Sequence, residues 1–109
     1  MPRIESLSGR PEFRRVYASG RRCTRDGVTV VASARSEGPP RLGLSVGLSA
    51  GSAVVRNRIR RRLREAVRAY GPAPADIVVV GRAPVHSAPF PQVEEYVSEC
   101  LTRAGVARA

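Results

Sequence analysis

The feature that most constrains the fold of this chain is the stretch of residues 54–68, in which seven arginines are interleaved with apolar residues. The apolar residues recur at intervals of three and four, the spacing of one face of an α-helix. At about 100° per residue they fill an arc of roughly 120°. They are Val55, Ile59, Leu63, Ala66, Val67 and Tyr70. The stretch therefore predicts an amphipathic helix that buries this arc against a core and keeps most arginines outside.

Residues that cap helices lie at both ends of this stretch. Ser49 or Ser52 can accept a backbone hydrogen bond from the first turn. Gly71 and Pro72 follow Tyr70, and such a pair stops a helix. We therefore expect the helix to begin after one of the two serines and to end near Tyr70.

The charge of this helix narrows the class of partner. Arg60, Arg64 and Arg68 are four residues apart, and each like-charged pair costs about 0.2–0.5 kcal/mol. Glu65 is the only acid among them, and the whole chain has 19 basic residues, all arginine, against nine acidic ones, for a net charge of +10. Such a chain attracts polyanions, so the candidate partners are nucleic acid and an anionic membrane. A solvated charged face without a partner is the alternative.

Two further segments have helical patterns. Ser8 is a candidate cap for a helix that Gly20 ends, and Phe13, Val16 and Tyr17 share one face of it. Pro91 opens a last helix. Its apolar stripe consists of Val93, Tyr96, Val97, Cys100 and Leu101.

Residues 21–47 and 75–82 have strand patterns. Residues 28–34 alternate, with Thr29, Val31 and Ser33 on the face opposite the other valines and alanines. In residues 42–47 one face carries only Gly43, Ser45 and Gly47, so either another segment packs closely on it or it forms the floor of a groove. The run 75–82 is continuously apolar and predicts a strand buried on both faces, and 83–91 reads as a loop. This order of elements predicts an α+β sandwich with helices against a sheet.

Length and composition predict a single domain, residues 1–109, with a flexible N-terminal arm over 1–8 and a loose C-terminus over 104–109. No apolar run has the length of a secretory signal or a membrane span, so we expect a cytoplasmic protein. Cys23 and Cys100 are far apart in sequence and have no neighbouring metal ligands. We interpret both as buried or half-buried hydrophobic residues in a reducing compartment.

Signals of an enzyme are weak. His86 is the only histidine and has no flanking carboxylate, which disfavours a hydrolase triad. A chain without lysine cannot form the phosphate loop of nucleotide-binding proteins. Glu94, Glu95 and Glu99 are read as the solvated face of the last helix rather than as metal ligands. We therefore predict no catalytic residue and no metal site in this chain.

Residues 41–66, RLGLSVGLSAGSAVVRNRIRRRLREA, resemble the protein subunit of bacterial ribonuclease P. That family carries a glycine-rich strand followed by an Arg-Asn-Arg helix, here Arg56, Asn57 and Arg58. The similarity extends to EFRRVYASG, which resembles the N-terminal helix of the family, and to DIVVVGRAPV, which resembles a later strand. It covers most of residues 7–101.

The resemblance implies a two-layer α/β sandwich of the α+β class. The family fold is a mixed four-stranded sheet with three helices, ribosomal protein S5 domain 2-like, and contains a left-handed βαβ crossover, which is rare among proteins in general.

The resemblance also implies a function. In this family the catalyst is a large RNA subunit, whose metal ions, with magnesium expected, remove the 5′ leader from precursor tRNA. The protein binds the ribonuclease P RNA subunit and the leader of precursor tRNA. It needs no cofactor of its own, and no membrane or further protein partner is implied.

Two sets of residues are assigned by the resemblance. The set expected to bind the RNA subunit comprises Arg56, Asn57, Arg58, Arg60, Arg61, Arg62, Arg64 and Arg68. The set expected to line the leader groove, between the sheet and the N-terminal helix, comprises Phe13, Tyr17, Val31, Ser45, Arg56 and Arg60. Aromatic rings there could stack on unpaired bases, although core packing is the alternative for both rings. The chain departs from the family at Val31, where an aromatic is frequent, and at Leu48 and Ser49, where a lysine pair is frequent.

Three other functions remain open from the sequence alone. One is a ribosomal-type protein that only scaffolds RNA. The second is a peripheral membrane protein with a basic amphipathic helix, which an aliphatic stripe without Trp makes less favourable. The third is a nuclease that needs no RNA subunit. Reconstitution with RNA, flotation with anionic liposomes and cleavage by RNA-free protein would separate them.

Overall fold

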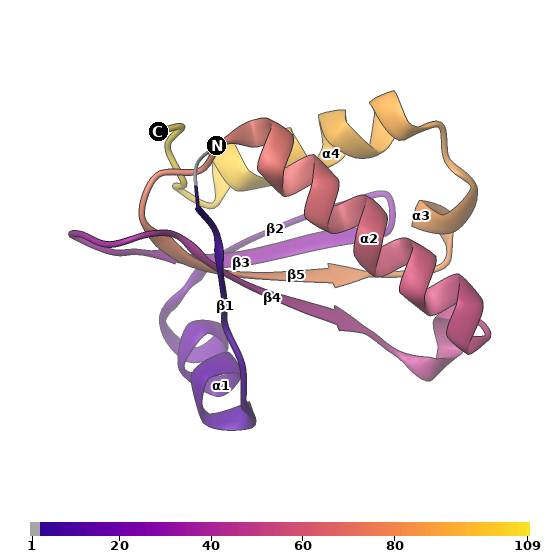
Figure 1. Cartoon of the computed structure of the whole chain (residues 1–109), viewed down its shortest axis with the longest axis horizontal. Coiled ribbons are helices and arrows are strands. Elements are labelled where there is room, and N and C mark those ends of the chain that lie inside the picture. The colour runs from indigo at the N-terminus through magenta and orange to yellow at the C-terminus, as the bar shows by residue number, and fades with distance from the viewer. Residues whose placement is uncertain (1–2) are drawn as a thin grey trace.

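The computed structural model describes residues 3–109, in which five strands form one mixed sheet in the order β1-β4-β5-β3-β2 (Figure 1). The strands are β1 (Glu5–Ser6), β2 (Arg21–Arg25), β3 (Val28–Ala34), β4 (Arg41–Val46) and β5 (Ala75–Gly81). The helices are α1 (Arg10–Ser19), the 3₁₀ turn η1 (Leu48–Ala50), α2 (Ala53–Tyr70), α3 (Pro84–Ser87) and α4 (Phe90–Arg103). The α+β class expected from the order of elements is confirmed.

The sheet has five strands rather than the four expected, because part of the N-terminal arm pairs with it. Glu5 and Ser6 lie beside Arg41 and Leu42 in parallel, and the Leu7 amide donates to the Leu42 carbonyl at 3.0 Å. The Leu7 side chain is buried. The prediction of a flexible arm is therefore wrong from residue 5 onward, and residues 1–2 lie outside the described part.

The two faces of the sheet are covered unequally, as Figure 1 shows: α2 and α4 lie side by side over one face, and α1 lies under the other. The main core lies between the sheet and α2 with α4, and it contains the inward residues of β3 and β5 such as Val30 and Val79. A smaller core lies under α1, where Val16 packs with Val31 and Val78. The alternation of residues along β3 thus predicted the two faces correctly, and β5 is buried on both faces as expected.

The helix α2 has the boundaries that its capping residues predict. The Val55 amide donates to the Ser52 hydroxyl at 3.3 Å, so Ser52 is the cap and Ser49 lies in η1. At the other end Gly71 adopts a left-handed conformation, with φ of 70°, and its amide bonds back to the Val67 and Arg68 carbonyls. A left-handed residue favours glycine because other side chains clash with the backbone there.

The connection from β4 through α2 to β5 joins two neighbouring parallel strands, while β3 pairs with β5 and β2 in the antiparallel sense. This crossover sets α2 directly over the strand that precedes it. The arginines of α2 are therefore held on a rigid element at one side of the sheet.

Two local expectations are corrected. The cap of α1 is Gly9, with φ of 87°, and no side chain of the described residues, Ser8 included, makes a capping bond there. The segment 83–91 contains the short helix α3, since the Val85 and His86 amides bond to the Arg82 and Ala83 carbonyls. These bonds are local turns that proline at position 84 permits, because a proline fits the first turn of a helix.

The C-terminal residues 104–109 are packed rather than loose. Val106 is buried in the main core, and its carbonyl accepts a hydrogen bond from the Tyr70 hydroxyl at 2.5 Å. The Arg108 guanidinium lies over the Tyr70 ring, 4.1 Å from its centroid. The segment therefore closes the end of α2. Within residues 3–109, no helix is both long enough and apolar enough to cross a membrane.

Candidate nucleic-acid interface

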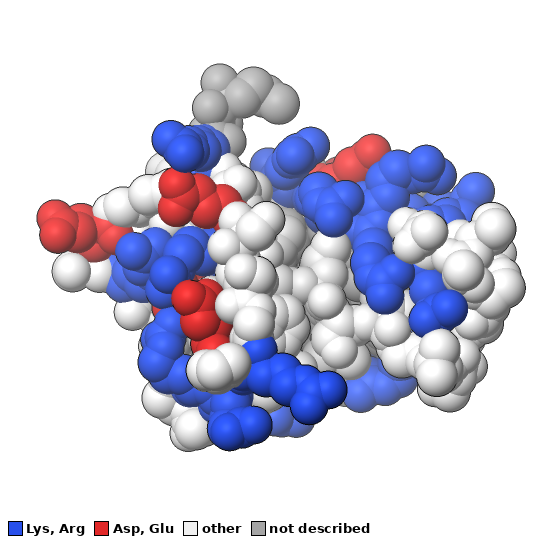
Figure 2. Space-filling model, turned by 60° about the horizontal axis from the view of Figure 1, so that its bottom comes forward, with Lys and Arg blue, Asp and Glu red and all other residues white. Residues whose placement is uncertain are grey.

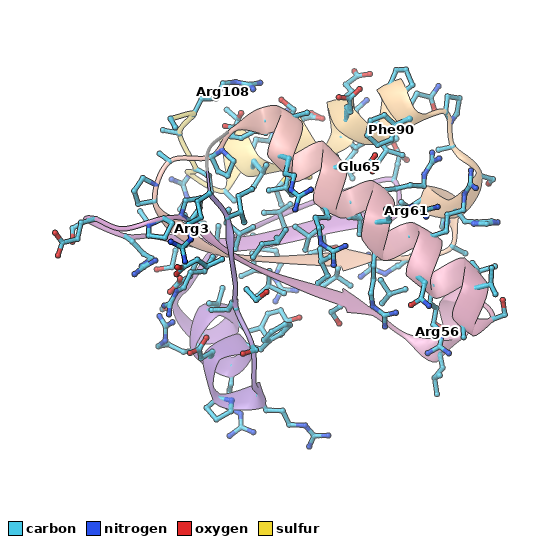
Figure 3. All side chains as sticks on the ribbon, in the orientation of Figure 1. Arg3, Arg56, Arg61, Glu65, Phe90 and Arg108 are labelled. Atoms are coloured by element: carbon cyan, nitrogen blue, oxygen red, sulfur yellow. The ribbon has the colours of Figure 1, made fainter. Side chains whose placement is uncertain are left out.

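The arginines of α2 project on two flanks and on the outer surface of the helix, as Figure 3 illustrates with Arg56 near its start and Arg61 in its middle. Arg58, Arg61, Arg64 and Arg68 are exposed, whereas Arg56 is partly buried. Within the described residues none of the seven arginines of this helix forms a salt bridge. Their positive charges can therefore be neutralised by an external anion.

One flank of α2 lines a groove. Arg60, Arg64 and Arg68 follow each other by one helical turn, about 6 Å along the axis. They form a wall of a groove of about 500 Å³ whose other wall is β1 with the residues that follow it, and whose floor includes Gly43 and Leu44. Figure 2 shows a strip of uncharged surface between arginines on the right and mixed charges on the left. A row of cations beside an uncharged floor suits the backbone of a single polynucleotide strand.

Asn57 orients the first arginine of this row. The Arg60 guanidinium donates to the Asn57 side-chain oxygen at 2.9 Å, and both side chains lie at the surface of the helix. The residue between the two arginines of the Arg-Asn-Arg motif thus holds a third arginine. This contact restricts the conformations of Arg60 and lowers the entropy lost when it binds an anion.

Arg62 differs from the other arginines because it is engaged inside the molecule. Its guanidinium donates to the Ala88 carbonyl and lies over the Phe90 ring, 5.7 Å from the centroid. These contacts tie α2 to the segment between α3 and α4. Arg62 was expected to bind the RNA subunit, and the structure gives it this packing role in the free protein.

Phe13 and Tyr17 lie on the same side of α1, as expected. The Phe13 ring is half-buried against Gly43: a Cβ atom placed at Gly43 would lie 2.5 Å from the ring. Tyr17 is 38% exposed, and the Arg22 guanidinium lies 5.9 Å from its ring centroid. Packing against the sheet therefore explains the position of the Phe13 ring, whereas the Tyr17 ring is exposed to solvent.

Two arginines beside these rings were missed from the sequence. Arg10 and Arg14 line a surface hollow of about 500 Å³ together with Phe13 and Tyr17. Residues 10, 13, 14 and 17 have the spacing of one helix face, so this spacing could have identified Arg10 and Arg14 from the sequence. A mixed aromatic and basic helix face is a common way of binding unpaired nucleotides.

The prediction that Val31 lines the leader groove is wrong in this structure. Val31 is 1% exposed and packs under α1 with Val16 and Val78. Thr29, on the same face, is also buried, and its hydroxyl accepts a hydrogen bond from Arg82 at 3.0 Å. Helix α1 covers this face of the sheet, because its apolar residue Val16 is buried against it.

Ser45 remains accessible. It is half-buried and lines a cavity of about 400 Å³ at the ends of β4 and β5, next to Ser49 and Arg82. Arg82 was missed because it follows an apolar run and its sequence neighbours indicate only a loop. Arg82 lies beside Ser45 and Thr29 and therefore brings a positive charge to this cavity.

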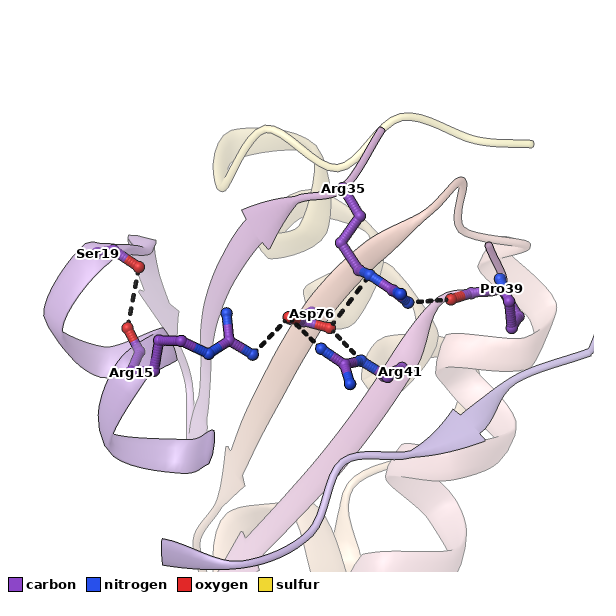
Figure 4. Close-up of polar contacts among 6 residues, drawn as sticks. All are labelled: Arg15, Ser19, Arg35, Pro39, Arg41 and Asp76. Atoms are coloured by element: carbon purple, nitrogen blue, oxygen red, sulfur yellow. Dashed lines mark hydrogen bonds and ion pairs between the residues drawn. The ribbon is translucent and has the colours of Figure 1, made fainter. Parts of the chain in front are cut away.

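A buried carboxylate holds α1 and the sheet together (Figure 4). Asp76, at the start of β5, is 2% exposed. Arg41 binds both its oxygens, at 2.6 and 2.8 Å, and Arg15 of α1 binds one at 2.8 Å. Arg35 lies 3.8 Å away. The hydrogen bonds from Arg41, and then the one from Arg15, hold the pKa of the Asp76 carboxyl below its usual value against the opposing effect of burial.

Known proteins with similar sequences include several ribonuclease P protein components. A family model described as Ribonuclease P matches residues 1–105. The ribonuclease P protein component of Symbiobacterium thermophilum is 40% identical over 110 aligned positions, covering 97% of this chain and 96% of that protein. The corresponding protein of Gluconacetobacter diazotrophicus is 37% identical, covering 95% and 94%.

Solved structures of RNase P proteins have a similar fold. The fold is similar to that of the RNase P protein of Staphylococcus aureus, with a TM-score of 0.79, 28% identity and coverage of 95% of this chain and 98% of that one. It is also similar to the RNase P protein of Thermotoga maritima, with a TM-score of 0.75, 26% identity and coverage of 87% and 93%.

Proposed function

Because the chain belongs to the Ribonuclease P family, we propose that it is the protein subunit of ribonuclease P, which binds a catalytic RNA and assists removal of the 5′ leader from precursor tRNA. The observation that carries this proposal is the arginine surface of α2, whose cations have no acidic partner among the described residues. Cations without internal partners need an external anion, and the phosphates of RNA supply one.

The outer face of α2 is the part that we assign to the RNA subunit. Arg58 and Arg61 are exposed and are held on a capped, well-packed helix. Guanidinium groups bind phosphate in a bidentate manner, and a rigid helix presents them without further ordering. Contacts to phosphate would fix the position of the protein on the RNA rather than select a sequence.

The face of α1 and the adjoining sheet is the part that we assign to the leader. Tyr17 can stack on an unpaired base, and Arg10 and Arg14 can bind the adjacent phosphates. On the sheet, Ser45 and Arg82 offer a hydroxyl and a cation. Binding the leader, which the mature product lacks, would make the complex prefer precursor over product.

The metal ions are assigned to the RNA. Among residues 3–109 no three His, Cys, Asp or Glu side chains come together as ligands of a metal ion, and the chain is strongly basic. The protein side chains thus do not fit a metal site, and the magnesium of the holoenzyme would be held by phosphates of the RNA subunit. The protein would assist by neutralising nearby phosphates.

Reconstitution tests the proposal. The purified chain is mixed with a ribonuclease P RNA subunit and precursor tRNA at a magnesium concentration too low for the RNA alone. We expect cleavage at the mature 5′ end only when both subunits are present. RNA-free protein is the control, and cleavage by it would indicate a nuclease. A complex that binds RNA but gives no cleavage would favour a scaffolding protein instead.

A further inference from the structure

The two cysteines are distant in sequence, but the fold brings them together. Cys23 lies on β2 and Cys100 on α4, and their Sγ atoms are 3.0 Å apart. Both are free thiols in this structure. We propose that they form a dithiol site that small-molecule disulfides convert into an internal disulfide bond between β2 and α4.

The surroundings of the pair hold the two elements in place. On β2, Arg25 forms an ion pair with Glu99 of α4, and its guanidinium lies 4.6 Å from the Tyr96 ring centroid. These contacts hold β2 and α4 together next to the two thiols. A bond between the sulfurs would need only a small movement of the side chains.

The unequal burial of the thiols defines the order of the reaction. Cys23 is partly exposed, whereas Cys100 is 0% exposed. Burial, together with the contact to Cys23, raises the pKa of the Cys100 thiol to about 12. The thiolate is the nucleophile in thiol–disulfide exchange. Cys23 is therefore the thiol that an external disulfide reaches first.

The exchange balances in two steps. Cys23 loses its proton to solvent, and its thiolate attacks one sulfur of the external disulfide, forming a mixed disulfide and releasing one thiolate, which solvent protonates. The Cys100 sulfur then attacks the Cys23 sulfur and expels the second reagent thiolate, which takes up the proton that the Cys100 thiol releases. Two protein thiols are oxidised by two electrons, and the external disulfide is reduced to two thiols.

The consequence is a covalent link between the edge strand and the last helix. Strand β2 is at the end of the sheet and pairs only with β3 among the described strands. The new bond would join residues 77 positions apart, and closing so long a loop removes much of the entropy of the unfolded chain. We expect the oxidised protein to unfold at least about 10 °C higher than the reduced one.

The experiment uses the full-length folded protein, incubated with glutathione disulfide, quenched with acid and analysed by intact mass. We expect a product lighter than the reduced chain by two hydrogen atoms, resistant to alkylation, with the Cys23 and Cys100 peptides linked. Dithiothreitol should restore the starting mass and Tm. Neither thiol lies on α2, so this outcome is independent of whether the protein binds RNA.

Two variants identify the order of attack. In Cys100→Ser the reaction should stop at a glutathione adduct on Cys23, and in Cys23→Ser the folded chain should remain unmodified. The inference is overturned if the wild-type protein stops at the same adduct, links two chains together, keeps both thiols free, or forms the internal bond only in denaturant. The wild-type result alone decides the matter if either variant folds poorly.

Discussion

At the residue scale, contacts between backbone and side chain decide which positions tolerate change. Gly43 is the sharpest case, because the Phe13 ring occupies the space that a side chain would need. The close approach places an aromatic ring directly on β4. Gly43 therefore makes a close packing contact with α1, besides lining the groove beside α2.

We expect Gly43→Ala to displace the Phe13 ring. The new Cβ would lie 2.5 Å from the ring, and such overpacking costs roughly 1–3 kcal/mol. Urea denaturation measures the loss in the free energy of unfolding. Gly47→Ala is the matched control, because among the described residues its Cβ would meet only the Ser49 hydroxyl, at 4.0 Å. Equal stability of the two variants would show that the ring does not depend on Gly43.

At the element scale, α2 combines a structural face with a binding face. Its stripe of Ile59, Leu63 and Val67 is fully buried, while most of its arginines are at the surface. The helix is stable because the buried stripe and the caps compensate for repulsion between like charges. Changes to the cap and changes to the arginines should therefore have separable effects.

Ser52→Ala should destabilise the protein by about 1 kcal/mol, because the amide of Val55 loses its acceptor. Thermal unfolding followed by circular dichroism would detect this loss. Ser49→Ala is the control in the same loop, since Ser49 makes no capping bond. If Ser49→Ala destabilises the protein as much as Ser52→Ala, the cap has been assigned to the wrong serine.

Replacing Arg58 and Arg61 together by Ala should weaken binding to the RNA subunit and leave the free energy of unfolding nearly unchanged. The slope of log affinity against log salt should become shallower by about 0.7–0.9 for each phosphate that the variant no longer neutralises. Filter binding over a range of salt concentrations measures this slope. Arg103→Ala, on α4, is the control for the loss of one positive charge away from α2, where Arg103 pairs with Glu99 at 3.4 Å. A slope that stays at the wild-type value would mean that neither side chain binds phosphate.

At the scale of the whole molecule, Asp76 connects parts of the chain that local structure leaves separate. It binds Arg15 of α1 and Arg41 of β4, and Arg35 lies near it after β3. Without this carboxylate, positive charge from three segments would meet at one end of the sheet. The cluster therefore sets where α1, with Phe13 and Tyr17, sits on the sheet.

Stability should decrease in acid because of this carboxylate. The pKa of Asp76 is lowered in the folded state, so its contribution is complete above the unfolded value, about 3.9. It is lost as the pH falls through the lower folded value. Asp76→Asn should lower the free energy of unfolding at neutral pH by about 3–5 kcal/mol and should flatten this acid-dependent loss.

Denaturation of both proteins between neutral pH and acid measures this difference. Asp26→Asn is the matched control, because Asp26 is exposed and, among residues 3–109, makes only a distant ion pair with Arg25, at 3.6 Å. If Asp76→Asn and the wild-type protein lose stability in parallel as the pH falls, the carboxylate does not contribute in the manner described.

The features that the sequence by itself determined are those that repeat over a short span. The period of α2, its serine cap and glycine stop, the two faces of β3 and the doubly buried β5 are all local patterns, and the surplus of arginine is a property of composition. These patterns were enough to predict the α+β class, the Arg-Asn-Arg helix and a polyanion as partner.

Only the tertiary structure decided which distant residues meet. The pairing of β1 with β4, the burial of Val31 under α1, the arginines around Asp76 and the proximity of Cys23 to Cys100 all join positions remote in sequence. The physical reason is that periodicity shows which face of an element is apolar, whereas the segment that covers that face is selected by packing and by charge neutralisation across the whole chain.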